Sequence, residues 1–185
     1  MSRKELTSLL SHYETSHTSE VHYAPRFVSL LQNFPGCFRR DLVSGHITGS
    51  AWVVSSALDQ VVLLHHKKLN RWLQPGGHAD GEEDVLKVAA KELEEETGLS
   101  AYKWITKDVF DIDIHLIPER GNEPAHFHYD IRFIAMAEVS APLVVSNESR
   151  DVRWVPLSAV TEEAGFEESI LRMVKKTLKL KASLT

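Results

Sequence analysis

The sequence predicts an α/β fold, in which helices cover a β-sheet. Between residues 46 and 157, several short segments are rich in β-branched and aromatic residues, a composition typical of strands. One strongly helical segment interrupts them at residues 84–97, and a second helical pattern follows them at residues 166–178. Strands on both sides of one helix, with another helix at the end, favour a layered arrangement of helices and sheet.

The first 42 residues differ from the rest of the chain because they contain two helical patterns and none typical of a strand. Apolar side chains recur there in two groups with helical spacing: Leu6, Leu9, Leu10 and Tyr13, then Phe27, Leu30 and Leu31. Asn33 and the Pro35-Gly36 pair end the second pattern. We therefore expect residues 1–42 to form a helical extension packed on a main domain of residues 43–185.

The main domain is expected to begin with strands at residues 46–55, 60–66 and 71–75, the last running into a tight turn at Pro75-Gly76-Gly77. Further strands are expected at residues 107–117, 126–139 and 152–157. Within residues 126–133 polar and apolar side chains alternate, which predicts one polar face: His126, His128, Asp130 and Arg132. The last helix is expected to use four apolar residues spaced four apart: Phe166, Ile170, Val174 and Leu178.

Composition and charge narrow the class of protein. The 185 residues are 43% hydrophobic and 25% charged, which is ordinary for a globular domain. The net charge is −5 and no basic stripe is present, which argues against duplex nucleic acid as a partner. Cys37 is the single cysteine, and no apolar run approaches the length of a membrane span. We expect a soluble, cytoplasmic protein without a membrane partner.

The helix expected from Asp84 carries the most informative residues. One of its faces is predicted to be apolar and to pack on the domain, with Val85, Leu86, Ala89, Ala90 and Leu93. Glu92, Glu95 and Glu96 stand at i, i+3 and i+4 on another face, where three like charges repel unless a cation joins them. Carboxylate ligands without cysteine favour Mg²⁺ or Mn²⁺. The alternative is a solvated acidic face balanced by lysines.

Residues 77–99, GHADGEEDVLKVAAKELEEETGL, resemble the Nudix box, G-x5-E-x7-R-E-U-x-E-E-x-G-U, where U is aliphatic. Eight of the nine fixed positions agree, and Lys91 stands where the family has arginine. The resemblance extends from about residue 43 onward. It implies an α/β/α sandwich with a mixed β-sheet, in agreement with the layers expected above.

The resemblance also implies a metal site. The carbonyl of Gly77 and the carboxylates of Glu92, Glu95 and Glu96 would hold the ion, and either Glu92 or Glu148 would act as the general base. Glu148 is a candidate because many relatives place an extra carboxylate in such a loop, although a solvated loop carboxylate is the plainer interpretation. Lys91 supplies charge but no planar guanidinium, so we expect weaker orientation of the carboxylates.

Five further side chains are candidates for substrate binding, each with a plainer alternative: Arg71, His78, His126, His128 and Arg132. His78 directly follows Gly77, where the alternatives are contact with a phosphate or a metal-bound water and a role in the turn. His126 and His128, at i and i+2, have the spacing for a transition metal, but two ligands make an incomplete site. A phosphate contact and a plain solvent-facing strand are the other interpretations.

The predicted reaction is Mg²⁺-dependent or Mn²⁺-dependent hydrolysis of the diphosphate linkage in a nucleoside diphosphate joined to another group. Nucleotide sugars, ADP-ribose-like compounds and nucleoside triphosphates all stay open as substrates. The partner is then a small nucleotide, and a homodimer is conceivable because dimers are common among relatives. The alternative function is a catalytically silent Nudix-like nucleotide sensor or partner-binding module. An isopentenyl-diphosphate isomerase is disfavoured because no cysteine directly precedes the box.

Overall fold

The computed structural model describes residues 1–121 and 124–184, which fold into two compact units. Unit 1 consists of residues 1–50, 76–91 and 107–133, and unit 2 consists of residues 51–75, 92–106 and 134–185. Three elements run from one unit into the other: β1 (Gly45–Ser55), α3 (Val85–Thr97) and β7 (His126–Ala137). The chain therefore passes between the units several times.

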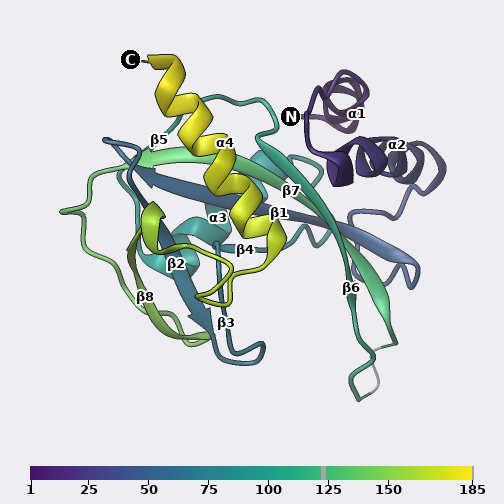
Figure 1. Ribbon diagram of the computed structural model, residues 1–185. Coiled ribbons are helices and arrows are strands. Elements are labelled where there is room, and N and C mark those ends of the chain that lie inside the picture. Colours follow the sequence, from purple (N-terminus) through teal and green to yellow (C-terminus); the bar gives the residue numbers. More distant parts are fainter. Residues whose placement is uncertain (122–123, 185) are drawn as a thin grey trace. The chain divides into compact units, whose positions relative to one another are not determined.

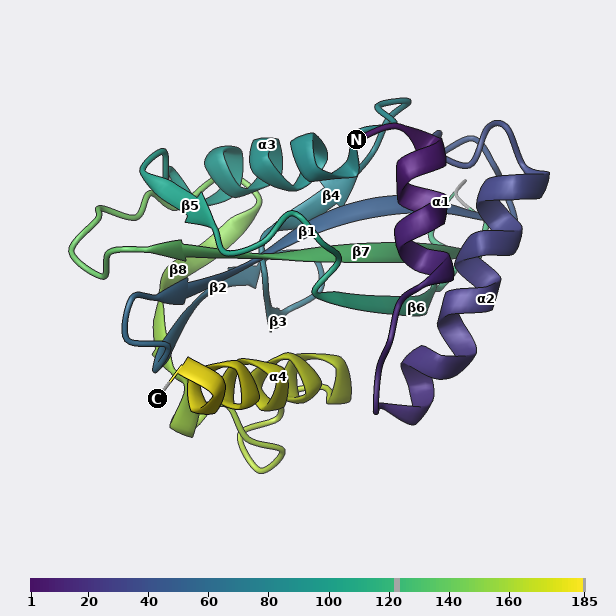
Figure 2. The same ribbon diagram turned by 90° about the horizontal axis from the view of Figure 1, so that it is seen from above.

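Unit 1 begins with two helices, α1 (Arg3–Ser11) and α2 (Thr18–Asn33), which lie side by side (Figures 1 and 2). A capping box between Ser2 and Glu5 begins α1, because each side chain accepts a hydrogen bond from the backbone N–H of the other residue. Five of the seven apolar residues predicted to form the helical faces are buried, whereas Leu9 and Tyr13 are partly exposed; the buried ones are Leu6, Leu10, Phe27, Leu30 and Leu31. The predicted N-terminal helices are confirmed.

The strands of unit 1 form two antiparallel pairs. β6 (Asp111–Ile117) pairs with β7 from Asp111 opposite Arg132 to Ile117 opposite His126, and the two strands run together in Figure 1. β4 (Gly76–His78) pairs with residues 48–50 of β1. The alternation predicted for β7 is confirmed, because Phe127 and Tyr129 contact Arg26 of α2 while Asp130 and Arg132 bond to each other.

The tight turn predicted at Pro75-Gly76-Gly77 is wrong, because both glycines belong to β4. A Cβ atom at Gly76 would lie only 2.1 Å from the hydroxyl oxygen of Ser50 on β1. The glycine is therefore required for the close approach of two strands and not for a turn.

In unit 2, the strand order is β3 (Arg71–Leu73), β2 (Gln60–His66), β1, β7 and β5 (Tyr102–Trp104), and β8 (Ser149–Pro156) also pairs with β2. A single turn, η1 (Leu157–Ala159), precedes α4 (Glu168–Leu184). Figure 2 shows the strands of unit 2 between α4 and the C-terminal end of α3, which is the expected α/β/α layering. The buried indole N–H of Trp52 donates to the hydroxyl of Thr177, 2.9 Å away, and so joins β1 to α4.

The faces of two helices differ from the prediction. α4 begins at Glu168, which leaves Phe166 outside it, and Leu178 is half exposed. Steps of four residues drift about 40° around a helix each time, so the buried face instead follows mixed steps of three and four: Ile170, Met173, Val174 and Thr177. In α3, Val88 is buried, whereas Leu86 and Ala90 of the predicted face are only partly buried, so the buried face is rotated around the helix from the predicted one.

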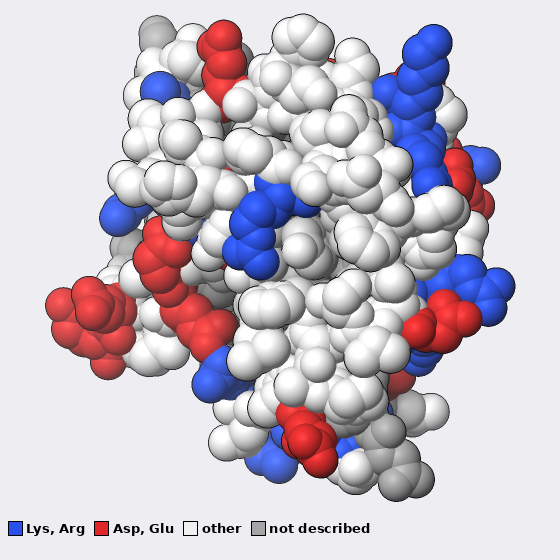
Figure 3. All heavy atoms as spheres, turned by 90° about the vertical axis from the view of Figure 1, so that its right-hand side faces the viewer, with Lys and Arg blue, Asp and Glu red and all other residues white. Residues whose placement is uncertain are grey.

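Figure 3 shows one face of the molecule, on which uncharged side chains cover most of the surface and the charged ones form separate small groups. That face presents no broad field of one sign to a ligand. Within the described residues, none of the helices has both the length and the apolar character needed to cross a membrane.

Candidate functional site

The three glutamates of the sequence motif lie near the C-terminal end of α3, in unit 2. Glu96 is buried, with 7% of its surface exposed, whereas Glu92 is half-buried and Glu95 is exposed. Glu92 and Glu96 are one helical turn apart and therefore share a face. The helix ends directly after them, because Gly98 adopts φ 72° and donates its N–H to the carbonyl of Glu94. The three carboxylates at this end of α3 therefore range from buried to exposed.

This donor set fits Mg²⁺. Carboxylate oxygens are the ligands that Mg²⁺ and Mn²⁺ prefer, and the three glutamates stand within about one turn of each other.

The first part of the motif lies in unit 1, where Gly77 of β4 faces Gly49 of β1. The acidic residues that follow contact the N-terminal segments. Glu83 forms an ion pair with Arg3 of α1, with 2.8 Å between nitrogen and oxygen, and Asp80 accepts two hydrogen bonds from Arg40. The bonds from Arg40 are the main cause of the lowered pKa of Asp80. These acidic side chains thus connect the motif to the N-terminal part of unit 1.

Two predicted site residues lie on the surface of unit 2. Arg71 is exposed on β3 and forms an ion pair with Glu167. Glu148 precedes β8; its carboxylate is about two-thirds exposed, and its backbone carbonyl accepts a hydrogen bond from the N–H of Lys67. His66 lies 4.0 Å from the carboxylate of Glu148. The loop backbone is therefore held in place while the carboxylate faces solvent.

Arg132 occupies a different environment from the one predicted for a substrate contact. Its guanidinium is 3% exposed and contacts three carboxylates: Asp130 at 2.7 Å, Asp111 at 3.1 Å and Asp113 at 3.6 Å. Although burial alone lowers the pKa of Arg132, these charges raise it above its usual range. Asp130 also accepts hydrogen bonds from Thr48 and Ser50 of β1. Arg132 is thus the centre of an internal charge network that joins β1, β6 and β7.

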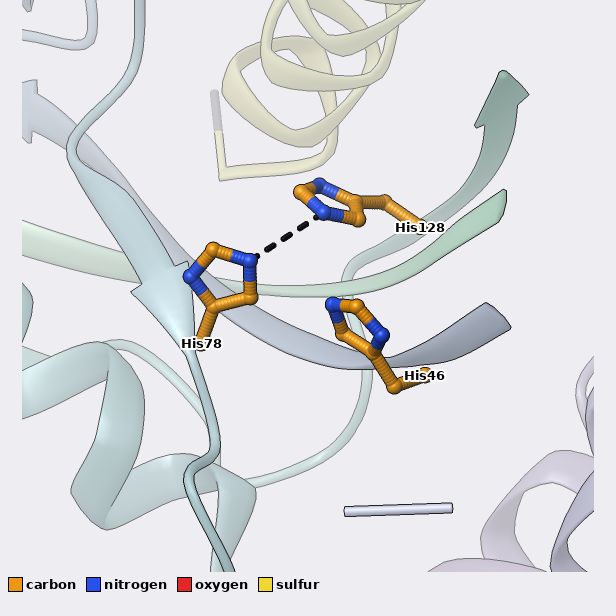
Figure 4. Close-up of side chains that lie close together, drawn as sticks. All are labelled: His46, His78 and His128. Carbon is orange, nitrogen blue, oxygen red and sulfur yellow. Dashed lines mark hydrogen bonds between the residues drawn. The ribbon is translucent and has the colours of Figure 1, made fainter. Parts of the chain in front are cut away.

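The three predicted histidines lie together in unit 1. The Nε2 atoms of His78 and His128 are 3.2 Å apart, and those of His126 and His128 are 3.3 Å apart. A further histidine, His46 of β1, completes the group, with its ring centre 5.0 Å from each of the other three. Figure 4 shows His46 beside His78 and His128. Sequence analysis missed His46, because one histidine at the start of a strand is no signal by itself. The only local sign of this group in the sequence was the pair His126 and His128, two residues apart on β7.

Burial favours the neutral form of His46 and His128. Together with the positive charge that the neighbouring histidines would carry, it lowers the pKa of His128 to about 2. Burial also lowers the pKa of His46 to about 4, with the same contribution from His78 and His126, while the backbone of Leu42 opposes the shift. Neutral imidazoles carry a lone pair on one ring nitrogen, which is the form that binds metals.

Comparison with known proteins gives a consistent result. Residues 46–176 match the family model described as NUDIX domain. The chain is 27% identical over 131 residues to the bis(5'-nucleosyl)-tetraphosphatase [asymmetrical] of Rattus norvegicus, an alignment that covers 71% of this chain and 82% of the rat protein.

Solved structures show the same fold. A NUDIX family hydrolase from Clostridium perfringens superposes with a TM-score of 0.55 at 24% identity, over 73% of this chain and 97% of that one. A C. elegans Ap4A hydrolase in a binary complex superposes with a TM-score of 0.52 at 19% identity, over 74% and 98% of the two chains.

Proposed function

Because this chain belongs to the Nudix family and is a pyrophosphohydrolase, we propose that it hydrolyses, with Mg²⁺, a phosphoanhydride in a nucleoside diphosphate joined to another group. The observation that carries this proposal is the intact set of Glu92, Glu95 and Glu96 on one end of α3. Mn²⁺ suits the same oxygen ligands.

Among substrates, we propose dinucleoside tetraphosphates as the first class to test. The support is the likeness to the rat tetraphosphatase, which spans most of both chains. Nucleotide sugars, ADP-ribose-like compounds and nucleoside triphosphates contain the same phosphoanhydride and are the comparison substrates.

In the proposed site, Glu95 and Glu96 would hold the ion, with Glu92 beside them. Mg²⁺ bound there supplies charge neutralisation on the phosphate oxygens and a lower pKa for the attacking water. The general base, Glu92 or Glu148, removes the proton of that water as its oxygen forms a bond to phosphorus and the bridging P–O bond breaks. We include Arg71 as a phosphate contact, since its guanidinium is exposed, and exclude the buried Arg132.

The test is a substrate panel with the products identified, with and without Mg²⁺. Turnover that requires Mg²⁺ or Mn²⁺ is expected, and hydrolysis in ¹⁸O-water identifies the phosphorus atom that is attacked. Binding without turnover across the whole panel would instead indicate a nucleotide sensor.

The variants Glu148→Gln and Glu92→Gln, measured side by side, identify the general base. The variant in which the general base is replaced should lose kcat with little change in KM.

The proposal makes a specific prediction for Glu96. Glu96→Gln should lower kcat by at least about 100-fold, because an amide lacks the charge that holds the metal. Circular dichroism and thermal unfolding should stay close to those of the wild type.

The matched control is Glu94→Gln on the same helix. The carboxylate of Glu94 accepts a hydrogen bond from Tyr102, and position 94 is not one of the fixed positions of the motif. It should retain activity. Full Mg²⁺-dependent activity in Glu96→Gln would refute the assignment.

A further inference from the structure

Three imidazole rings converge in unit 1 from three different strands. His46 lies at the start of β1, His78 ends β4, and His128 lies in β7. Figure 4 shows the rings facing a common point. One nitrogen from each ring lies within 4.8 Å of the other two. A strand framework with backbone hydrogen bonds therefore holds three nitrogen donors in one place.

The spacing of these nitrogens is close to that of a metal site. A tetrahedral zinc ion with Zn–N bonds of about 2.0–2.1 Å places two ligand nitrogens about 3.3 Å apart. The Nε2 atoms of His78 and His128 are 3.2 Å apart. The protein thus already holds two of the donors near the separation that zinc requires.

His46 provides an independent indication. Its side chain is 1% exposed, and neither ring nitrogen has a hydrogen-bond partner of normal geometry among the described residues. Buried polar groups in folded proteins are nearly always satisfied, so a buried imidazole aimed into a group of other imidazoles points to a missing ligand. A cation bound by one of its nitrogens would satisfy it.

We propose that His46, His78 and His128 bind one Zn²⁺ ion per chain. Imidazole nitrogens suit Zn²⁺ and related transition metals, whereas Mg²⁺ and Ca²⁺ require oxygen ligands. This site uses none of the glutamates of α3, so it does not depend on the proposed function. It lies on the same strand as Gly77, since His78 is the next residue of β4.

His126 is the fourth member of the site. Its Nε2 atom is 3.3 Å from that of His128, and its Nδ1 atom is 2.9 Å from the carbonyl of Pro124. A hydrogen bond donated by Nδ1 to that carbonyl leaves the lone pair on Nε2, the arrangement common for metal-binding histidines. His126 also lines a pocket of ≈ 510 Å³ together with Arg40 and Arg120. The fourth ligand is therefore either His126 or an oxygen that enters from solvent.

The competing interpretation is a group of neutral imidazoles joined by N–H···N hydrogen bonds, which the 3.2 Å contact also permits. The two interpretations differ in zinc affinity. Protein without an affinity tag, stripped of metal by a chelator, should be equilibrated with Zn²⁺ alone and separated from unbound metal. We expect one Zn²⁺ per chain by elemental analysis, and an X-ray absorption spectrum with a shell of nitrogen or oxygen ligands at about 2.0 Å and imidazole scattering beyond it.

Variants then locate the ion. His46→Gln and His128→Gln should each weaken Zn²⁺ binding by at least about 100-fold in competition with a chromophoric chelator. His12→Gln, an exposed position on the surface of unit 1, is the matched control and should bind as the wild type does. The triple variant with Glu92, Glu95 and Glu96 changed to Gln should also retain the zinc, which separates this site from the proposed Mg²⁺ site.

Failure of the wild type to retain zinc would overturn the proposal, as would stoichiometric zinc in the His46→Gln/His128→Gln double variant. The absorption spectrum of the wild type decides the question even if the variants do not fold. Loss of hydrolysis in Glu96→Gln tests the other site alone, so the two proposals fail independently.

Discussion

Gly76 and Ser50 show how single residues set the spacing between β4 and β1. The strands approach so closely that no side chain fits at Gly76, since a Cβ atom would lie within 2.1 Å of the Ser50 hydroxyl oxygen. The same hydroxyl donates to Asp130, which in turn accepts from Arg132. A shift of Ser50 would therefore disturb the charge network as well as the strand pair.

Gly76→Ala should lower the free energy of unfolding by about 1–3 kcal/mol, because the added methyl group forces β4 away from β1 or displaces Ser50. Urea denaturation measures the change. Gly36→Ala is the control, since nothing lies within 4 Å of a Cβ atom there, and it should be close to neutral. Equal stability of the two variants would contradict this account of Gly76.

Lys91 is the one departure from the Nudix pattern, and it supports a prediction about catalysis. Lys91→Arg should raise kcat by about two- to tenfold with little change in KM, because a guanidinium can hold a carboxylate with two parallel hydrogen bonds. Steady-state kinetics on the best substrate of the panel tests this. Lys87→Arg, at an exposed position of the same helix, should leave kcat unchanged. A lower kcat in Lys91→Arg would show that the site is adapted to lysine.

At the scale of elements, β7 organises unit 1 by the alternation of its two faces. One face contacts α2 through Phe127 and Tyr129, which lie near Arg26. The other face carries His128 and the charged pair Asp130 and Arg132. A strand that is polar and buried on one face must satisfy those groups internally, and the aspartates and hydroxyls of neighbouring strands do so for Asp130 and Arg132.

A buried carboxylate of helix α2 also contacts the strands. Glu20 is 0% exposed and accepts hydrogen bonds from the hydroxyls of Tyr13 and Thr15 and from the backbone N–H of Ile112 on β6. It thus joins the α1–α2 connection, α2 and β6 in a single contact.

Glu20→Ala should destabilise the protein by about 2–3 kcal/mol, because it removes a buried acceptor of one backbone N–H and two hydroxyls, of which Tyr13 keeps a bond to the carbonyl of Phe110. Hydrogen exchange should show faster exchange at the Ile112 amide, and urea denaturation should show the loss of stability. Glu14→Ala, at an exposed position, should have neither effect. An unchanged exchange rate at Ile112 would mean that Glu20 does not hold α2 against β6.

At the scale of the whole molecule, the N-terminal helices belong to the same compact unit as the histidine group. The family match begins at residue 46, so α1 and α2 lie outside it, yet both are part of unit 1. Both helices contribute fully buried side chains to unit 1, including Leu6 and Phe27 at 0% exposure.

A chain consisting of residues 43–185 should therefore lose stability, although it contains the whole family match. Removal of α1 and α2 exposes apolar surface of unit 1, and we expect the thermal midpoint to fall by at least about 10 °C or cooperative unfolding to disappear. Differential scanning calorimetry of the full and shortened chains tests this. An unchanged midpoint would show that the helices are an independent addition.

The sequence by itself determined the elements and the family of this protein. Helices and strands are visible because their periods of 3.6 and 2 residues are local properties, and the glutamates of α3 fall within one continuous motif. Predictions that failed, such as the turn at Gly76 and the buried face of α4, concerned which neighbour a residue meets.

Only the tertiary structure decided which polar residues meet. His46, His78 and His128 come from three strands far apart in the chain, and no local pattern connects them. The same is true of Arg132, whose carboxylate partners Asp111 and Asp130 lie on two strands. The physical reason is that strand register, set by backbone hydrogen bonds and core packing, determines which side chains become neighbours, and register is a property of pairs of segments.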